Sequence, residues 1–368
     1  MISSIRAIAQ ETGYSPSTVS RALRGSGRIS SKVREVIRKA AKKAGYQVHP
    51  LLAQALSLAR QPKTSRYRET LGFIIEYPMN DCPDFQTAVY AGAEQRAASL
   101  AYKLEAFVLS GNPSQHRRWS AILRNRGIRG LIIMPRLEHR QPRLRFDWEH
   151  FAAVEIGRTL WNPLNLHRVE SAEYPKILES IHVLKKVGYR RIGMAIEPMQ
   201  NQHQYGVYYA VFLLMQQKLP PGQRVPILAM EGGWNEKNFR RWMRRYKPDV
   251  LIGHRIMEIC VWLQKLGLRI PDDVSIFRTD VREDDPPGLH RSYQFSGLRR
   301  DNFTTGRRAV EMVSNLLESG ELGLVGNPMC WQVSGLWVPG QTLSRSISSY
   351  ISSDGFLRTQ WPRSALRT

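Results

Sequence analysis

Long apolar runs are missing from this sequence of 368 residues. No stretch approaches the roughly 18 uninterrupted apolar residues of a membrane-spanning helix. The amino terminus also lacks the basic, apolar and small-residue order of a secretion signal. We therefore expect a cytoplasmic protein with no membrane segment. The chain is about two to three times as long as an ordinary domain, so we expect more than one hydrophobic core.

Cysteine is scarce as well. The three cysteines, Cys82, Cys260 and Cys330, are far apart and lack the spacing of metal ligands. We expect free thiols at mostly buried positions. We expect neither a metal site nor a cofactor.

The motifs of common enzyme classes are also absent. The sequence has no Gly-x-Gly-x-x-Gly after a strand-like run, no phosphate loop, no His-Glu-x-x-His and no Gly-x-Ser-x-Gly. The adjacent pairs Glu138-His139 and Glu149-His150 do not suggest catalysis, because neighbouring side chains diverge and nothing else converges on them. We predict that the protein is not an enzyme.

Acidic residues are outnumbered. The chain has 31 Asp and Glu against 54 Lys and Arg, which gives a formal charge of +23. Residues 1–68 hold 14 Lys and Arg against 2 Asp and Glu, a charge of +12. Less than a fifth of the chain therefore carries about half of the net charge, which is typical of a nucleic-acid-binding head.

Helical signals fill the first part of this basic head. The spacing of its apolar residues predicts a first helix that ends near Gly13. Ser15 and Pro16 predict a second helix, to about Leu23, because serine caps an orphan amide and proline suits the first helical position. We expect an inward face of Thr18, Val19, Ala22 and Leu23. We expect an outward face of Pro16, Ser17, Ser20, Arg21 and Arg24.

The outward face of the second helix is small, polar and basic. Such a face suits the major groove, where hydroxyls bond to bases or phosphates and arginine makes a bidentate contact to guanine. Arg21 is the best single candidate for reading a base. The alternative is an ordinary surface helix with solvated charges.

A third helix is predicted after the loop at residues 24–28. Ser30 or Ser31 is placed to cap it, and Gly45 is a natural stop. We expect its inward face to consist of Val33, Ile37, Ala40, Ala41 and Ala44. Its other face, which contacts phosphate or only keeps the head soluble, carries Lys32, Arg38, Lys39, Lys42 and Lys43.

The segment IRAIAQETGYSPSTVSRAL (residues 5–23), followed by Gly45 and Tyr46, closely resembles the head of the LacI/GalR family of regulators. The resemblance implies base contacts from Pro16, Ser17 and Arg21. It implies contacts mostly to the DNA backbone from Ser4, Ser15, Ser20, Arg28 and Ser30. Arg24 stands where the family usually has asparagine, and we retain it as a DNA-binding candidate.

Residues 49–56, HPLLAQAL, begin with a proline that suits a helix start, but they form only two to three turns. Such a helix should be unstable alone. The segment resembles the family's hinge helix, which folds when two copies meet over the minor groove and wedge a leucine into a base step. Leu56 is the first candidate for the wedge, although, counted from Tyr46, it lies one residue later than in the usual family pattern. Leu52, one turn earlier, is the second candidate. A plain amphipathic linker is the alternative, and residues 61–66 read as a flexible tether.

From about residue 70, short apolar runs alternate with amphipathic segments of helix length. The runs are residues 71–75, 104–109, 130–134, 152–156, 191–196, 225–230, 250–252 and 274–277. This alternation predicts an α/β fold with parallel sheets and helices on both sides.

Four landmarks extend the family resemblance to about Gln341: RGLII (129–133), LKKVGYRRIG (184–193), KPDVLI (247–252) and GLRIPDDVSI (267–276). The resemblance implies a periplasmic-binding-protein-like (type I) body. Such a body has two Rossmann-like lobes, three crossings of the chain between them, and a ligand cleft at their interface.

Three residues are ligand candidates on this basis. Trp234, in the segment EGGW, matches a family position where an aromatic ring stacks on a sugar, and Asp280 falls on the family's acidic residue. Phe85 is the third candidate. An aromatic face offers an apolar platform, and a carboxylate accepts sugar hydroxyls. For Trp234 a place in the hydrophobic core is the alternative.

At two positions this sequence lacks the residues with which the family binds its ligands. The arginine of an Arg-x-x-Gly segment is replaced by His203 or Gln204, and an Asn-Asp pair is replaced by Arg255 and Ile256. We keep Arg255 as a ligand candidate. These differences favour an effector other than a standard sugar.

We therefore expect an all-α helix-turn-helix head (1–48), a hinge helix and linker (49–69), a bilobal body that binds an effector and dimerises (70–344), and a disordered or loosely docked tail (345–368). The expected function is a homodimeric repressor on a pseudo-palindromic operator in double-stranded DNA, controlled by a small molecule, a carbohydrate. Helices at 85–100 and 117–125 are candidates for the dimer face. The alternative is a repressor of the same fold without small-molecule control.

Overall fold

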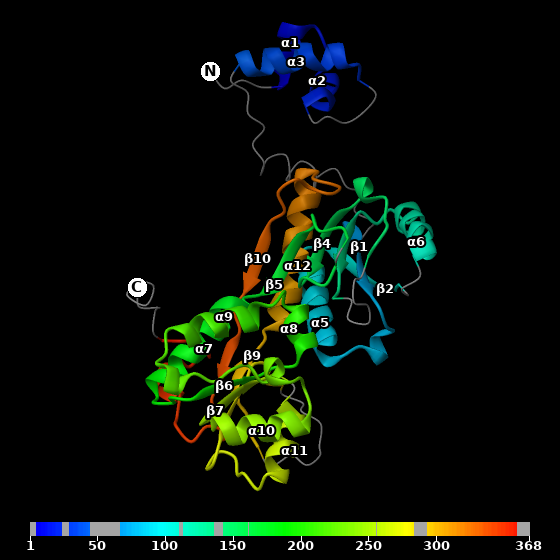
Figure 1. Cartoon of the computed structure of the whole chain (residues 1–368). Coiled ribbons are helices and arrows are strands. Elements are labelled where there is room, and N and C mark those ends of the chain that lie inside the picture. Colours follow the sequence, from blue (N-terminus) through cyan, green and yellow to red (C-terminus); the bar gives the residue numbers. More distant parts are fainter. Residues whose placement is uncertain are drawn as a thin grey trace. The chain divides into compact units, whose positions relative to one another are not determined.

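The computed structural model describes residues 5–23, 29–44, 67–109, 113–135, 143–160, 162–254, 256–282 and 293–358, without a few of the side chains in α1, α2, α3 and α6. The chain divides into two units, residues 1–66 and residues 67–368 (Figure 1). In these described ranges no helix is long and apolar enough to cross a bilayer.

The head is a small bundle of α1 (Ile5–Thr12), α2 (Pro16–Leu23) and α3 (Ser31–Lys43). Val19 and Ala22 of α2 are fully buried against Ile8 and Ile37, as the apolar spacing predicted. Ser30, one of the two predicted caps, accepts a hydrogen bond from the amide of Val33 at 3.4 Å. The hinge segment, residues 49–66, lies outside the described residues, and so do Leu52 and Leu56.

The first lobe of the body is built on a six-stranded sheet with the order β10-β5-β4-β3-β1-β2, parallel throughout. Its strands are β1 (Glu69–Ile75), β2 (Tyr102–Val108), β3 (Gly130–Ile133), β4 (Ala152–Ile156), β5 (His167–Ser171) and β10 (Cys330–Val333). The sheet begins one residue before the predicted start of the body.

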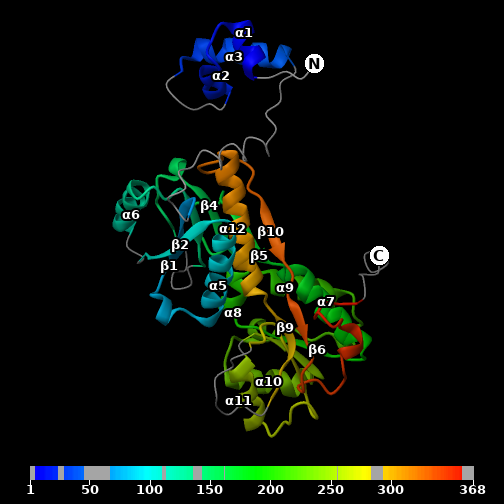
Figure 2. The same ribbon diagram turned by 180° about the vertical axis from the view of Figure 1, so that it is seen from behind.

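Helices cover both faces of this sheet. Phe73 and Val154 pack with α5 (Asp84–Ser99) and α12 (Asn302–Ser319), which lie side by side in Figures 1 and 2. Ile74, next along β1, turns to the opposite face and packs with Leu123 of α6 (Pro113–Asn125). The alternation of side chains along a strand produces this two-sided core.

Two glycines set the contact between α5 and α12. A Cβ at Gly92 would lie 2.0 Å from the carbonyl oxygen of Phe303, and a Cβ at Gly306 would lie 1.9 Å from that of Val89. No real Cβ atom fits at such distances. The two helices therefore meet backbone to backbone, which only glycine permits.

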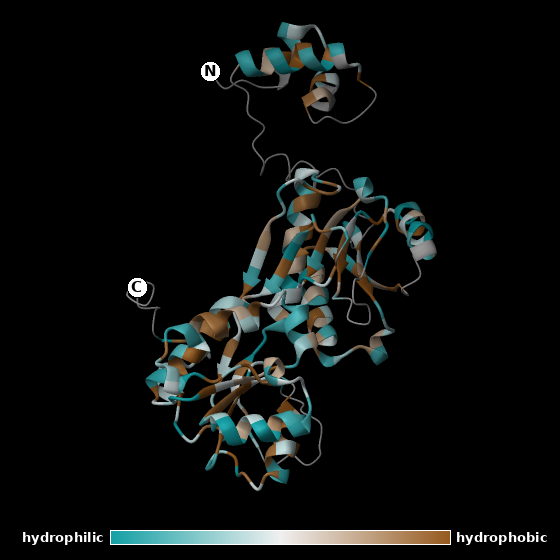
Figure 3. Cartoon of the chain, in the orientation of Figure 1, coloured by the Kyte–Doolittle hydropathy of each residue, from teal (hydrophilic) through white to brown (hydrophobic). Residues whose placement is uncertain are grey.

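The second lobe has a five-stranded sheet with the order β11-β9-β8-β7-β6, in which only β11 is antiparallel. Its strands are β6 (Ile192–Ala195), β7 (Val250–Gly253), β8 (Ser275–Arg278), β9 (Ser296–Arg299) and β11 (Leu336–Val338). Its helices are α7 (Glu173–Lys186), α8 (Pro198–His203), α9 (Val207–Gln217), α10 (Glu236–Tyr246) and α11 (Ile256–Lys265). Figure 3 shows apolar strands inside both lobes and a largely hydrophilic α10.

The chain passes between the lobes three times, as the family resemblance implies. The crossings lie between β5 and α7 at residue 172, between β9 and α12 at residues 300–301, and between β10 and β11 at residues 334–335. The predicted α/β fold with two parallel-sheet lobes is confirmed.

One predicted strand is wrong. Residues 225–230 form no strand, and Leu228–Glu231 is instead a 3-10 turn. Pro226 has no N–H to give to a sheet, and the amide of Val225 donates to Gln216 Oε1 at 2.7 Å. Four strands, β5, β9, β10 and β11, were not predicted.

The expectation of a disordered or loosely docked tail from residue 345 is wrong for residues 345–358. Ile347 and Ile351 are buried in the core of the second lobe, with Tyr350 and Leu357 packed beside them. The Arg345 guanidinium lies over the Tyr189 ring, 5.0 Å from its centroid. Residues 359–368 lie outside the described residues.

Candidate functional site

The N-terminal end of α2, the second helix of the head, is exposed. Ser15 and Pro16 are exposed there, and the Ser15 hydroxyl accepts a hydrogen bond from the Thr18 amide at 3.2 Å. The backbone of Ser17, Ser20 and Arg21 belongs to α2, but their side chains lie outside the described residues. The other DNA-binding candidates outside the described residues are Ser4, Arg24 and Arg28.

The basic face predicted for α3 is exposed. Lys39 lies 3.1 Å from Glu35, and Lys43 lies 3.3 Å from Glu11 of α1. The remaining basic residues of this face, all exposed, are Lys32, Arg38 and Lys42. Such a surface suits a phosphate backbone.

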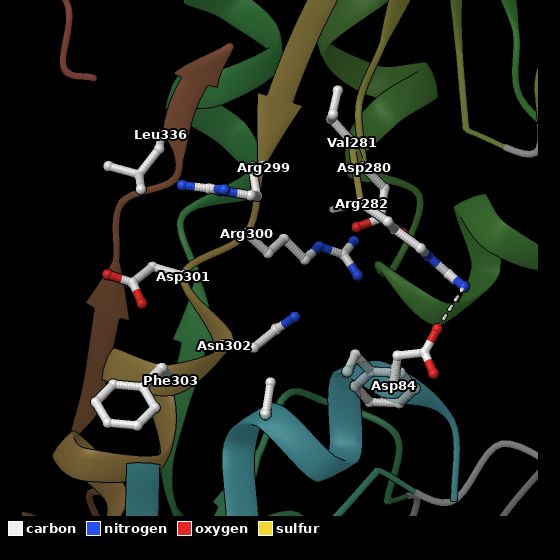
Figure 4. A pocket seen from close by; sticks show the side chains of 12 residues that line it. Asp84, Asp280, Val281, Arg282, Arg299, Arg300, Asp301, Asn302, Phe303 and Leu336 are labelled. Atoms are coloured by element: carbon white, nitrogen blue, oxygen red, sulfur yellow. Dashed lines mark ion pairs between the residues drawn. The ribbon is translucent and has the colours of Figure 1, made fainter. Parts of the chain in front are cut away.

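A cavity of about 280 Å³ lies in the body where the two lobes meet. The first lobe lines it with the start of α5 and the start of α12, and the second lobe lines it with the ends of β8 and β9 (Figure 4). Its lining residues are Asp84, Phe85, Ala88, Asp280, Val281, Arg282, Arg299, Arg300, Asp301, Asn302, Phe303 and Leu336. Parallel sheets commonly bind ligands beyond the carboxyl ends of their strands.

Asp280 follows β8, and only 13% of its side chain is exposed. Burial alone would raise the pKa of this carboxyl, but Arg300, His254 and Arg282 hold it below its usual value. The carboxylate lies 3.6 Å from Arg282 Nε, and Arg282 Nη1 lies 3.9 Å from Asp84 Oδ2. Arg282 of the second lobe thus forms an ion pair with Asp84 of the first lobe in the cavity lining (Figure 4).

Arg300 extends into the cavity from the end of β9 (Figure 4). Its Nε donates to Glu173 Oε1 and its Nη2 donates to Tyr208 Oη, both at 3.0 Å. Burial alone would raise the pKa of Glu173, but Arg300 and Lys176 lower it to about 2. Glu173 is therefore ionised at neutral pH and forms an ion pair with Arg300, which lines the cavity.

The structure brings together two of the four predicted ligand residues. Phe85 and Asp280 both line the cavity. Trp234 lies elsewhere in the second lobe: it is half-buried, its Nε1 donates to Glu258 Oε2 at 2.7 Å, and its ring lies 5.5 Å from that of Trp262. Arg255 lies outside the described residues.

Several cavity residues were missed from the sequence, chiefly Arg300, Asn302 and the Glu173 behind them. The signal for the first two was the polar run Arg299 to Asn302, which begins at the last residue of β9. Asp301 of this run caps α12 by accepting from the Thr304 amide at 2.9 Å. The run reads as a helix start, and nothing in the local sequence separates its capping residue from those that line a cavity.

The cysteines play no part in this site. All three are free, with Cys260 buried and Cys82 half-buried, whereas Cys330 is exposed, contrary to expectation. Burial raises the pKa of the Cys260 thiol to about 12, so it is an inert core residue. Among the described residues, no group of three or more His, Cys, Asp or Glu side chains could hold a metal ion.

The polar groups of the cavity combine donors and acceptors in close to equal number. The charged residues of the lining are Arg282, Arg299 and Arg300 with Asp84, Asp280 and Asp301, and the Asn302 amide adds a donor and an acceptor. The apolar part of the lining consists of Phe85, Ala88, Val281, Phe303 and Leu336. Such a lining suits a small ligand rich in hydroxyl groups, which both donate and accept hydrogen bonds.

Comparison with known proteins matches both parts of the chain. Residues 4–48 match the model of the bacterial regulatory proteins, lacI family. Residues 181–323 match the periplasmic binding protein-like domain. The chain is 23% identical over 328 residues to the HTH-type transcriptional regulator KdgR of Bacillus subtilis (strain 168), with 85% of this chain and 91% of that protein covered.

Solved structures share the fold. The complex of the transcriptional regulator CelR with cellobiose aligns with a TM-score of 0.52 at 16% identity, covering 92% of this chain and 99% of that one. The lac repressor dimer bound to operator and the anti-inducer ONPF aligns with a TM-score of 0.52 at 16% identity, covering 94% and 100%.

Proposed function

The chain belongs to the LacI/GalR family of DNA-binding transcriptional regulators, and we propose that it is a repressor that binds a pseudo-palindromic operator as a homodimer. A small molecule in the interlobe cleft, of the carbohydrate class, changes its affinity for the operator. The family consists of regulators and not of enzymes, in agreement with the prediction from the missing catalytic motifs. Because the proposed target is operator DNA, the proposed location is the cytoplasm, at the nucleoid.

The head is the observation that carries this proposal. In helix-turn-helix proteins the second helix enters the major groove with its N-terminal residues at the base edges. Here Val19 and Ala22 anchor α2 to the core of the head, and Ser15 and Pro16 at its start are exposed. We propose base contacts from Pro16, Ser17 and Arg21. We propose backbone contacts from Ser4, Ser15, Ser20, Arg24, Arg28 and Ser30.

The hinge and the dimer follow from the same argument. We propose that residues 49–56 fold into a helix when two copies meet over the minor groove, with Leu56 or Leu52 as the apolar wedge. A two-fold dimer presents two heads and therefore reads two related half-sites. The solved lac repressor, a dimer on its operator, supports this arrangement.

The cleft supports a small, hydroxyl-rich effector. A cavity of about 280 Å³ is at the lower end of the range for ligand pockets and suits a monosaccharide. Asp280 offers a hydroxyl acceptor and Phe85 an apolar platform. The solved CelR structure, a complex with cellobiose, supports a carbohydrate. The proposed ligand contacts are Phe85 and Asp280, which line the cavity. Arg255, which lies outside the described residues, stays a prediction.

A second candidate function is a repressor that works without a ligand. The observation that favours it is the pairing of cavity charges within the chain, Arg300 with Glu173 and Arg282 with Asp280. Isothermal titration calorimetry of the full chain against a broad panel of mono- and disaccharides separates the two. Saturable binding that also shifts operator affinity supports control by a ligand. No binding across the panel supports the second candidate.

Selection of bound sequences from a random duplex library, at near-physiological salt, tests the proposed function. We expect enrichment of one sequence with two-fold symmetry, because two heads of a symmetric dimer face two half-sites. Recovery of a single asymmetric site would contradict the dimer, and recovery of no consensus would contradict sequence-specific binding.

A further inference from the structure

A buried group of charged side chains joins two of the segments that cross between the lobes. Glu173 is the first residue of α7, two residues after β5 ends, and only 5% of it is exposed. Its carboxylate accepts hydrogen bonds from Arg300 Nε at 3.0 Å and from Tyr208 Oη at 2.9 Å. Arg300 stands at the second crossing, between β9 and α12. One carboxylate therefore ties the first crossing to the second.

Lys176 extends this group to the third crossing. Its Nζ lies 3.5 Å from Glu173 Oε1 and donates to the hydroxyl of Ser171 at the end of β5. The third crossing runs against its stem, since a Cβ at Gly335 would lie 2.7 Å from Lys176 Cε. All three crossings thus meet at one ionic group, the crossing cluster of Glu173, Lys176, Tyr208 and Arg300.

Arg300 is the member of the crossing cluster that also lines the ligand cavity. Its side chain is 21% exposed, whereas those of Glu173 and Lys176 are 5% exposed. A guanidinium has five N–H donors, and the bonds to Glu173 and Tyr208 engage two of them. A ligand that accepts a hydrogen bond from Arg300 would therefore touch a group bound directly to the crossings.

We propose that the Glu173–Arg300 pair couples the ligand cavity to the relative position of the two lobes, with Glu173 as the positioning residue for Arg300. This inference rests on the proposed function and assigns the route by which the cleft reaches the operator-binding head. Each crossing between β-strand and helix is only one or two residues long. A shift at one crossing is therefore transmitted to the others through the buried pair.

The physical reason lies in the burial of the pair. A buried carboxylate that loses a cation is costly, and Lys176, at 3.5 Å, would be the one cation of the cluster left beside Glu173. Glu173 is therefore expected to move with Arg300 rather than release it. Coupling of this kind needs an element with two arrangements, each favoured by a different ligand. Here the two arrangements are two relative positions of the lobes, which hinge at the crossings. We expect the crossing cluster to favour the arrangement of the lobes in which Arg300 keeps its hydrogen bonds to Glu173 and Tyr208.

A charge-removing variant of Glu173 tests this with the full-length protein and the duplex selected from the random library. Glu173→Gln keeps an oxygen acceptor but removes the charge. We expect about tenfold weaker binding of the selected duplex, because the lobes spend less time in the binding arrangement. The salt dependence of binding should stay as in the wild type, since the phosphate contacts of the head are untouched.

Glu155→Gln is the matched control. Glu155 is also fully buried and also paired with an arginine, Arg168, at 2.9 Å, but it lies within the first lobe and away from the crossings. We expect its thermal midpoint to change while binding of the selected duplex stays within about twofold of the wild type. Equal effects of the two variants on duplex binding would overturn the proposal, since the loss would then follow from stability alone.

The double variant Glu173→Gln, Arg300→Gln covers the case in which the single variant does not fold. It leaves Lys176 as the one remaining cation of the crossing cluster, and burial lowers the pKa of that ammonium, so Lys176 can release its proton. The double variant should therefore fold and show the same weakened binding as the single variant. Wild-type affinity in the double variant would overturn the proposal. Failure of the wild type itself to prefer the selected duplex would instead count against the proposed function, so the two failures are distinguishable.

Discussion

His254 is a buried histidine between Thr279 and Asp280. Its Nδ1 lies 3.1 Å from the Thr279 hydroxyl, and its Nε2 lies 3.8 Å from the Asp280 carboxylate. Burial lowers its pKa from the ordinary 6.5 to about 4, against the opposing effect of Asp280. The folded protein therefore binds this proton less readily than the unfolded chain does.

The sign of the resulting pH dependence follows from linkage. The contribution of His254 to the free energy of unfolding is fully present above pH 6.5 and is lost as the pH falls to about 4. The shift corresponds to a loss on the order of 3 kcal/mol across this window. In His254→Asn the free energy of unfolding, measured by urea titration at a series of pH values, should depend less steeply on pH between 6.5 and 4.

His150→Asn is the control for this experiment. The His150 side chain is 40% exposed, lies beside Glu149 and is not among the residues that line the cavity. We expect its pH dependence to match the wild type. A full wild-type slope in His254→Asn would show that another group is responsible for acid destabilisation.

Arg21 is the residue proposed to read a base. Arg21→Ala should cost about 1 to 3 kcal/mol of binding to the selected duplex and relax the preference at one base pair. Competition with duplexes substituted at each position measures both effects. An equal loss on the selected duplex and on random DNA would rule out a reading role and leave only a phosphate contact.

At the scale of elements, the contact between α5 and α12 depends on two small residues. Alanine is normally the better helix former by about 1 kcal/mol. At Gly306, however, the added Cβ would meet the Val89 carbonyl oxygen at 1.9 Å. We expect Gly306→Ala to lower the free energy of unfolding by about 2 kcal/mol or more, because the helices must separate.

Asn315→Ala, on the exposed side of α12, is the matched control and should be neutral or slightly stabilising. Thermal and urea unfolding of both variants measure the difference. A stabilised Gly306→Ala protein would mean that α5 and α12 are not in backbone contact.

The elements were predictable where one local pattern decides them. Apolar spacing and the Ser15-Pro16 start gave the bounds of α2 to the residue, and apolar runs located β1, β3, β4 and β7. β5 was not predicted, because its sequence HRVES is largely polar and shows no apolar run. Arg168 and Glu170 of that strand are paired with Glu155 and Arg158, contacts that no local pattern contains.

The residues of the candidate site were also predictable only in part. Asp280 was predicted from a family position and Phe85 was named as a further candidate, and both line the cavity. Glu173 and Arg300 are 127 residues apart in sequence, so their pairing arises only from the crossing of the chain between the lobes. Trp234 shows the reverse case: its Nε1 bond to Glu258 and its contact with Trp262 engage it within the second lobe.

At the scale of the whole molecule, charge and fold agree. The basic surplus of residues 1–68 lies in the unit that the helix-turn-helix forms, and the paired, nearly neutral cavity lies in the unit of two lobes. A polyanion-binding part and a small-ligand part are thus joined by residues 49–66. Under the proposed function, this arrangement lets a ligand change DNA affinity without touching DNA.

Titration of the full-length protein with the selected duplex and with a scrambled duplex, at near-physiological salt, tests the central claim most directly. Fluorescence anisotropy of the labelled duplexes gives both affinities, and the saturation point gives the number of chains per duplex. We predict two chains per duplex and binding that is about 10³-fold or more tighter for the selected sequence. Weak binding that is equal for both duplexes would mean that the basic head is only an electrostatic anchor, and the claim of a sequence-specific regulator would be wrong.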